Sequence, residues 1–151
     1  MNLRPLLRAH GEWLARLREY VYGAGSLDPD VIGRSDLCEL GDWLHAAGSR
    51  YRRFPEYAVA DQAHAAFHVE AADVVRLAQS GRRHEAALAL GDDGRLRKQS
   101  AIMLRAFLSL NHAVTAVDAH EARFEAVRAG PSRIPAGVTD PARGDSSAGE
   151  A

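Results

Sequence analysis

Residues 55–81 read PEYAVADQAHAAFHVEAADVVRLAQSG, and this stretch decides the fold. Its apolar side chains recur at steps of three and four residues, the spacing that places them on one face of an α-helix. Pro55 suits the first turn of a helix, and Gly81 suits its end. The sequence therefore predicts a long amphipathic helix whose buried stripe consists of Tyr57, Ala60, His64, Phe67, Ala71, Val74 and Ala78.

Two helices are predicted before this stretch. The same apolar spacing predicts a helix over 2–22, ended by glycines, with a stripe that includes His10. The loop 23–34 carries an Asp-Pro signal, which allows a short turn of helix at 29–32. Ser35 can cap a further helix over 35–47, and Gly48 can end it.

Two helices are predicted after it, a short one over 82–90 and a long one over 95–128. The long helix has a heptad-like seam formed by Leu96, Met103, Leu110, Val117 and Phe124, with Ser100, Phe107 and Val114 between them. Ser100 and Glu121 interrupt the apolar pattern. The interruptions favour a packing face of a bundle over an extended coiled-coil stalk.

The chain is predicted to hold one all-α domain, a four-helix-type bundle with a short extra helix, over residues 1–129. Residues 130–151 are rich in Gly, Pro, Ser, Ala and Asp, so little of this segment can be buried. We expect a disordered tail there, and no strand pattern or internal repeat occurs.

The charge balance limits the classes of partner. The net charge is −1, which gives no basic surface for nucleic acid or anionic membrane. No continuous apolar run approaches the roughly 20 residues of a membrane span, and the N-terminus lacks the pattern of a signal peptide. We expect a cytoplasmic protein with neither nucleic acid nor membrane as partner. A single cysteine, Cys38, excludes an intramolecular disulfide.

Three histidines and this cysteine are candidate metal ligands. His64 and His68 are four residues apart, so a helix places both imidazoles on one face. His10 lies on the buried stripe of its own helix, where it is either a hydrogen-bonded core histidine or a ligand. Near Cys38, the helix-interior Gly41 indicates a close neighbour, which is either an ion with its ligands or another helix.

Together these residues offer three imidazoles and one thiolate, the donor set that Zn²⁺ prefers in tetrahedral sites. The predicted ligands are His10, Cys38, His64 and His68, with His45 as the substitute candidate. A di-iron bundle needs several inward carboxylates, which the stripes lack. Four good ligands also close the site to substrate, which argues against a zinc enzyme.

The motifs resemble those of the chemoreceptor zinc-binding domain (CZB), which occurs in bacterial chemoreceptors and diguanylate cyclases and as free-standing proteins. The pattern appears as His10 with Trp13, then 38–43 (CELGDW), then 64–68 (HAAFH). The resemblance covers about residues 5–125. It implies a four-helix bundle, commonly homodimeric, with tightly bound zinc on His10, Cys38, His64 and His68.

The resemblance also implies a function. The expected role is that of a regulatory module, not an enzyme, whose zinc-bound cysteine senses zinc or oxidants such as hypochlorous acid. No receptor or cyclase module accompanies the domain in this sequence, so we expect a free-standing member that signals to a partner in chemotaxis or cyclic-di-GMP signalling. The alternatives are a bundle whose zinc is purely structural and, third, a zinc-dependent enzyme with an open coordination position.

Overall fold

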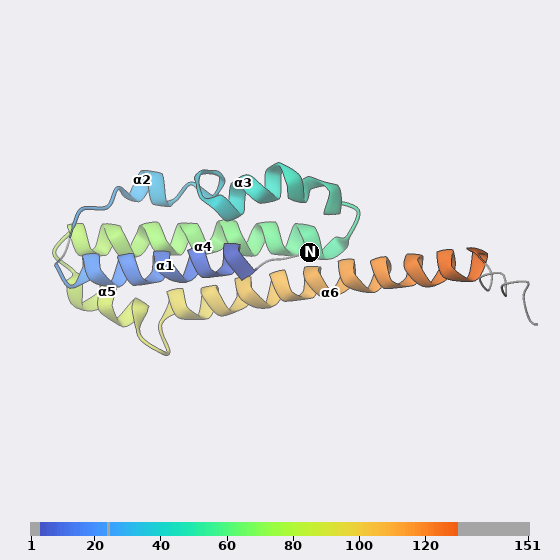
Figure 1. Cartoon of the computed structure of the whole chain (residues 1–151). Helices are drawn as coiled ribbons and strands as arrows, with labels where there is room; N and C mark the ends of the chain where they lie inside the picture. Colours follow the sequence, from blue (N-terminus) through green and yellow to red (C-terminus); the bar gives the residue numbers. More distant parts are fainter. Residues whose placement is uncertain (1–3, 24, 130–151) are drawn as a thin grey trace, which may run out of the picture.

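The computed structural model describes residues 4–23 and 25–129, and within these ranges it contains helices and turns but no strand (Figure 1). The predicted all-α fold is confirmed. The predicted tail, 130–151, lies outside the described residues. In chain order the elements are α1 (Arg4–Val21), α2 (Pro29–Ile32), the 3-10 turn η1 (Ser35–Leu37), α3 (Glu39–His45), the 3-10 turn η2 (Ala47–Tyr51), α4 (Pro55–Gln79), α5 (Arg83–Leu90) and α6 (Arg95–Ala129).

Helix α4 is the centre of the fold. It packs against each of the other five α-helices. The short elements α2, η1 and α3 lie along one side of α4, and α6 lies along the opposite side (Figure 1). Three long helices of the bundle are therefore α1, α4 and α6. The broken segment α2–α3 occupies the position of a fourth.

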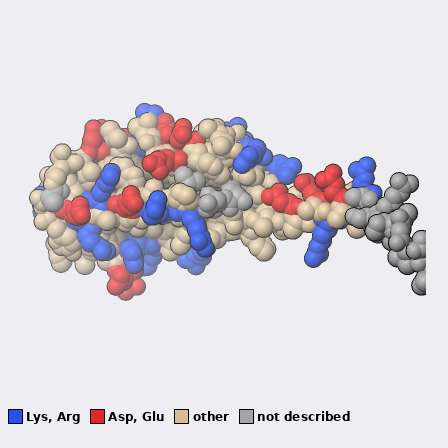
Figure 2. All heavy atoms as spheres, viewed as in Figure 1, with Lys and Arg blue, Asp and Glu red and all other residues tan. Residues whose placement is uncertain are grey.

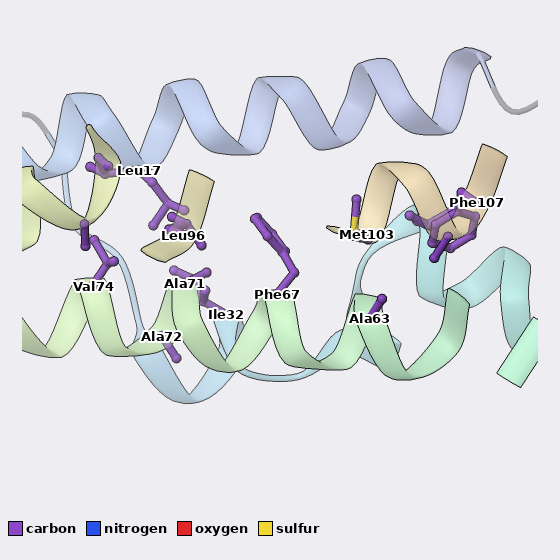
Figure 3. Close-up of a cluster of buried hydrophobic side chains, with 14 of the residues drawn as sticks. Leu17, Ile32, Ala63, Phe67, Ala71, Ala72, Val74, Leu96, Met103 and Phe107 are labelled. Carbon is purple, nitrogen blue, oxygen red and sulfur yellow. The ribbon is translucent and has the colours of Figure 1, made fainter. Parts of the chain in front are cut away.

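The core lies where α1, α4 and α6 meet. Figure 3 shows Leu17 of α1, Phe67 of α4, and Leu96 and Met103 of α6 in the space between these helices. Each of these side chains is at most 1% exposed. Burial of a side chain of this size contributes about 1.5–3 kcal/mol, so the predicted apolar stripes are what hold the three helices together.

The segment around Cys38 differs from its prediction. The sequence predicts one helix over 35–47 that Ser35 caps, whereas the chain forms η1 first and begins α3 only at Glu39. The backbone at Cys38 is extended, with φ −99° and ψ 158°, and Cys38 is the N-cap residue of α3. A Cβ at Gly41 would lie 1.8 Å from the Ser35 carbonyl oxygen, so the turn can fold back here only onto glycine. The close neighbour of Gly41 is therefore this turn, not an ion or another helix.

The short helical turn at 29–32 is confirmed as α2. The Asp28 carboxylate caps it by accepting the Asp30 N–H at 2.9 Å. Arg76 of α4 lies 3.1 Å from the Asp30 carboxylate and so ties α2 to α4. The peptide after α2 is thereby held beside α4, where two of the candidate ligands are located.

Helix α6 is longer than the bundle that it packs against (Figure 1). Its seam is buried from Leu96 to Val114 and then emerges, because Phe124 is 60% exposed. The helical stretch Arg83–Arg128 contains a window with mean hydropathy 1.3, of which 28% is buried. By length and composition alone, the stretch could cross a membrane, which the search for continuous apolar runs did not predict. Core helices of soluble proteins meet the same criterion.

Candidate metal centre

Three of the four predicted ligands lie together in the fold. Sγ of Cys38 and one ring nitrogen each from His64 and His68 are within 4.8 Å of one another. Cys38 comes from the start of α3, and both histidines come from successive turns of α4. The two imidazole centroids are 4.8 Å apart with planes at 89°, and His64 Nε2 lies 3.2 Å from the Cys38 Sγ.

The sulfur of Cys38 is held by the turn that α3 makes. The Gly41 N–H donates to Sγ at 3.3 Å, and Sγ in turn lies 3.5 Å from the Ser35 carbonyl oxygen. Burial raises the pKa of the Cys38 thiol, against the backbone N–H groups that lower it. The thiol therefore needs a nearby cation to be a thiolate at neutral pH, and a bound metal ion supplies one.

His68 has a defined tautomer because of its backbone partner. Its Nδ1 lies 2.6 Å from the Ile32 carbonyl oxygen, which can only accept, so Nδ1 carries the proton. The lone pair is then on Nε2. This hydrogen bond of a ligand's second nitrogen to a carbonyl is the arrangement that orients histidines in metal sites.

His64 is the most enclosed member of the group, with 0% of its surface exposed. Burial, followed by the neighbouring His68 and His10, lowers its pKa to about 3, so the ring is neutral at pH 7. Its Nδ1 is buried and has no hydrogen-bond partner among the described residues. A neutral imidazole that faces a thiol at 3.2 Å is a competent metal ligand.

His10 lies beside this group but is not part of it. Its ring makes a T-shaped contact with Phe67, with centroids 4.2 Å apart, and its Nε2 lies 3.3 Å from the Ser100 Oγ. Burial, together with His68, lowers its pKa to about 4, so this ring is neutral as well. The assignment of His10 as the fourth ligand stays a prediction.

The substitute ligand His45 lies elsewhere. Its Nε2 is 3.6 Å from a carboxylate oxygen of Asp61, and its side chain is 43% exposed. It does not join the ligand group found among the described residues.

A cavity of about 140 Å³ adjoins the candidate ligands. His10, Cys38 and His68 are among the residues that line it, together with Trp13 of α1 and Leu37 of η1. Cys38 is half-buried. Cys38 thus borders open space, whereas His64 does not line the cavity and is 0% exposed.

The donor set fits zinc. Zn–S and Zn–N bonds of about 2.3 and 2.0 Å at a tetrahedral angle place sulfur and nitrogen about 3.5 Å apart. The 3.2 Å between Cys38 Sγ and His64 Nε2 is close to that spacing. One soft thiol and neutral imidazoles select zinc over magnesium or calcium, which require oxygen ligands.

Sequence reasoning missed two groups at this site. The Ile32 carbonyl could not be identified from side-chain patterns, because its role depends on how the loop passes α4. Ser100 was noticed only as an interruption of an apolar seam. A polar residue at a position that should be buried is the one signal that could have indicated a partner such as His10.

Comparison with known proteins identifies the domain. The family model of the chemoreceptor zinc-binding domain matches residues 10–75, a range that contains all four predicted ligands. Neither the curated proteins nor the solved structures give a match. The match and the grouping of Cys38, His64 and His68 support the same conclusion: residues 10–75 of this chain belong to the chemoreceptor zinc-binding domain family.

Proposed function

We propose that this protein is a regulatory zinc module in which His10, Cys38, His64 and His68 bind one Zn²⁺ ion. Cys38 is the responsive ligand, and its state reports zinc availability or oxidants to a partner protein. The observation that carries the proposal is the grouping of one thiol and two neutral imidazoles within 4.8 Å inside a chemoreceptor zinc-binding domain.

The environment of Cys38 supports a sensing role over a purely structural one. Cys38 is half-buried and lines the cavity, which gives a small oxidant a route toward its side chain. A metal-bound thiolate keeps nucleophilic character at neutral pH, which a buried free thiol lacks. A structural zinc site would instead shield its sulfur on all sides.

The redox step follows from sulfur chemistry. The Cys38 thiolate transfers two electrons to hypochlorous acid and takes up its oxygen and proton, while chlorine leaves as chloride. The product is a sulfenic acid. The site then lacks its one anionic ligand, and neutral imidazoles alone hold a dication less tightly.

The structural consequence is confined to the region around η1. Cys38 joins η1 to α3, and none of His10, His64 and His68 lies on these two elements. The far end of α3 is anchored independently, because Leu44 is 0% exposed and its carbonyl accepts the Tyr57 hydroxyl at 2.9 Å. We expect oxidation to release residues 35–41 while the last turn of α3 stays packed.

The test uses zinc-loaded protein with one ion per chain. Treatment with equimolar hypochlorous acid should release zinc to a chromophoric chelator and increase hydrogen exchange in residues 35–41. The Cys38→Ser variant, loaded with as much zinc as it will hold, should show no oxidant-dependent change. Cys38 found oxidised by mass spectrometry, with zinc retained and exchange unchanged, would favour the structural-zinc alternative.

The enzyme alternative requires an open coordination position for water or substrate. Four protein ligands would close that position. A coordination sphere of three protein ligands and one water, found by X-ray absorption on the zinc-loaded protein, would support an enzyme and contradict the proposal.

The partner is proposed to be a signalling protein of chemoreceptor or diguanylate cyclase type in the cytoplasm. Acidic and basic side chains are interspersed over the face of the bundle in Figure 2, which suits a protein partner better than nucleic acid. A second copy of the chain is proposed as a further partner through the exposed part of α6.

A further inference from the structure

Ser100 lies on the face of α6 that packs into the bundle. The neighbouring seam residues Leu96 and Met103 are fully buried, and Ser100 itself is half-buried. The preceding residue, Gln99, donates from its side chain to the Ala63 carbonyl of α4 at 3.2 Å. Ala63 directly precedes His64, so this hydrogen bond holds α6 in a defined register beside the histidines of α4. The position of the Ser100 hydroxyl is thereby defined.

The Ser100 hydroxyl meets the ring of His10. Its Oγ lies 3.3 Å from His10 Nε2, and the edge contact with Phe67 fixes the ring from another side. A neutral imidazole has one N–H and one lone pair, so the partner of one nitrogen decides what the other can do.

The hydrogen bond between His68 and the Ile32 carbonyl shows the same kind of arrangement at another histidine of the site. There the partner of Nδ1 leaves Nε2 with the lone pair. A hydroxyl that accepts from Nε2 of His10 leaves the lone pair on Nδ1. His10 borders the same cavity as Cys38 and His68, so Nδ1 is the nitrogen available to an ion bound there.

We propose that Ser100 is a positioning residue of the zinc site: it accepts the Nε2–H of His10 and so presents Nδ1 to the ion. The inference rests on the proposed function, since it takes His10 as a ligand. Ser100 lies outside residues 10–75, the part of the chain that the family model matches. The zinc site thereby acquires a direct link to α6, the helix that extends beyond the bundle.

The test compares Ser100→Ala with Ser100→Thr, which keeps the hydroxyl. Loss of such an outer hydrogen bond weakens metal binding by about tenfold, so Ser100→Ala should raise the zinc dissociation constant by that order. Ser100→Thr should bind zinc like the unmodified protein. Ser109→Ala, an exposed serine on the same helix, is the matched control and should have no effect.

Two further measurements separate positioning from general destabilisation. In a His10→Ala background, Ser100→Ala should cause no additional loss of zinc affinity. With Co²⁺ in place of zinc, Ser100→Ala should weaken the intense visible absorption of a tetrahedral site, because His10 is held less well.

Three results would overturn the inference. They are unchanged zinc affinity in Ser100→Ala, an equal loss in Ser100→Thr, and an undiminished loss in the His10→Ala background. A chain that binds no zinc at all would instead contradict the proposed function itself and remove the basis of this inference with it.

Discussion

The backbone around Cys38 shows how single residues create the candidate site. Cys38 is the N-cap of α3, and Gly41 both donates to its sulfur and leaves space for the Ser35 carbonyl. A cap residue normally serves only the helix. Here the same geometry aims a sulfur atom at two imidazoles of α4, so the local turn and the metal chemistry depend on the same few atoms.

Replacing Gly41 with Ala should disrupt both the turn around Cys38 and zinc binding. The new Cβ would lie 1.8 Å from the Ser35 oxygen, so η1 must shift. We expect the free energy of unfolding to fall by about 1–3 kcal/mol, as for other overpacked sites, and zinc affinity to fall with it. Urea unfolding and chelator competition measure the two effects.

The control is Gly11→Ala in α1, where a Cβ meets nothing within 4 Å. Alanine in an open helix position should raise stability by about 0.5–1 kcal/mol and leave zinc binding unchanged. If Gly41→Ala and Gly11→Ala change the free energy of unfolding and the zinc affinity alike, then the contact between Gly41 and Ser35 does not shape the site as argued.

The two histidines of α4 should matter more to zinc than His45 does. His64→Ala and His68→Ala each remove a ring nitrogen of the three-residue group, so each should weaken zinc binding by orders of magnitude. His45→Ala removes a half-exposed ring that pairs with Asp61, and it should have little effect. Elemental analysis and chelator competition test this, and equal losses in all three variants would contradict the ligand assignment.

At the scale of elements, the short helix α3 depends on its neighbours. Seven residues are too few to be helical alone in water, so packing must hold it. Its Leu40 and Leu44 are buried, and the Tyr57 hydroxyl supplies a donor to a carbonyl of its last turn, where intrahelical donors run out. If zinc binds as proposed, it would hold the first turn of α3, whereas the core holds the last turn.

Tyr57→Phe should loosen that last turn specifically. The substitution keeps the ring and removes the hydrogen bond to the Leu44 carbonyl, at a cost of about 0.5–1.5 kcal/mol. Hydrogen exchange should rise in the second half of α3 while zinc affinity changes little. Tyr22→Phe, at a residue that is 74% exposed, is the control. Increased exchange over η1 instead would mean that the two ends of α3 are not held separately.

At the scale of the whole molecule, the main feature is the part of α6 that extends beyond the bundle (Figure 1). Several apolar side chains along α6 are between 42% and 79% exposed, and the seam emerges from the bundle after Val114. Large exposed apolar side chains that gather on one element are typical of interaction sites. The residues concerned are Ile102, Leu104, Leu108, Phe124 and Val127.

We expect a second copy of the chain to cover the part of α6 that extends past Val114, so the protein should be a homodimer at tens of micromolar. Phe124→Glu should shift the light-scattering mass toward the monomer, because it places a charge in the proposed interface. Leu88→Glu on α5, at an equally exposed apolar residue, should leave the dimer intact. A monomer in the unmodified protein at these concentrations would count against the interface.

The sequence by itself determined the helical fold and the placement of most elements. Apolar periodicity is a local property, so the stripe of α4 and the buried part of the α6 seam could be read before any packing was known. The residue types and spacing also indicated the zinc chemistry, because His10 and Cys38 add a third imidazole and a thiol to the pair His64 and His68 on one helix face. Glycine and proline marked the ends of α1, α4 and α5 to within a few residues.

Only the tertiary structure decided how the site is assembled. The sequence predicts Ser35 as the N-cap of this helix, whereas in the structure Cys38 is the N-cap of α3. The difference arises because the backbone at Ser35 folds back against Gly41, a contact between two separate stretches of backbone. The partners of His68 and His10 are a loop carbonyl and a serine 90 residues away in the chain. Pairings of this kind depend on how the helices cross and on loop paths, which no periodicity in one segment can encode.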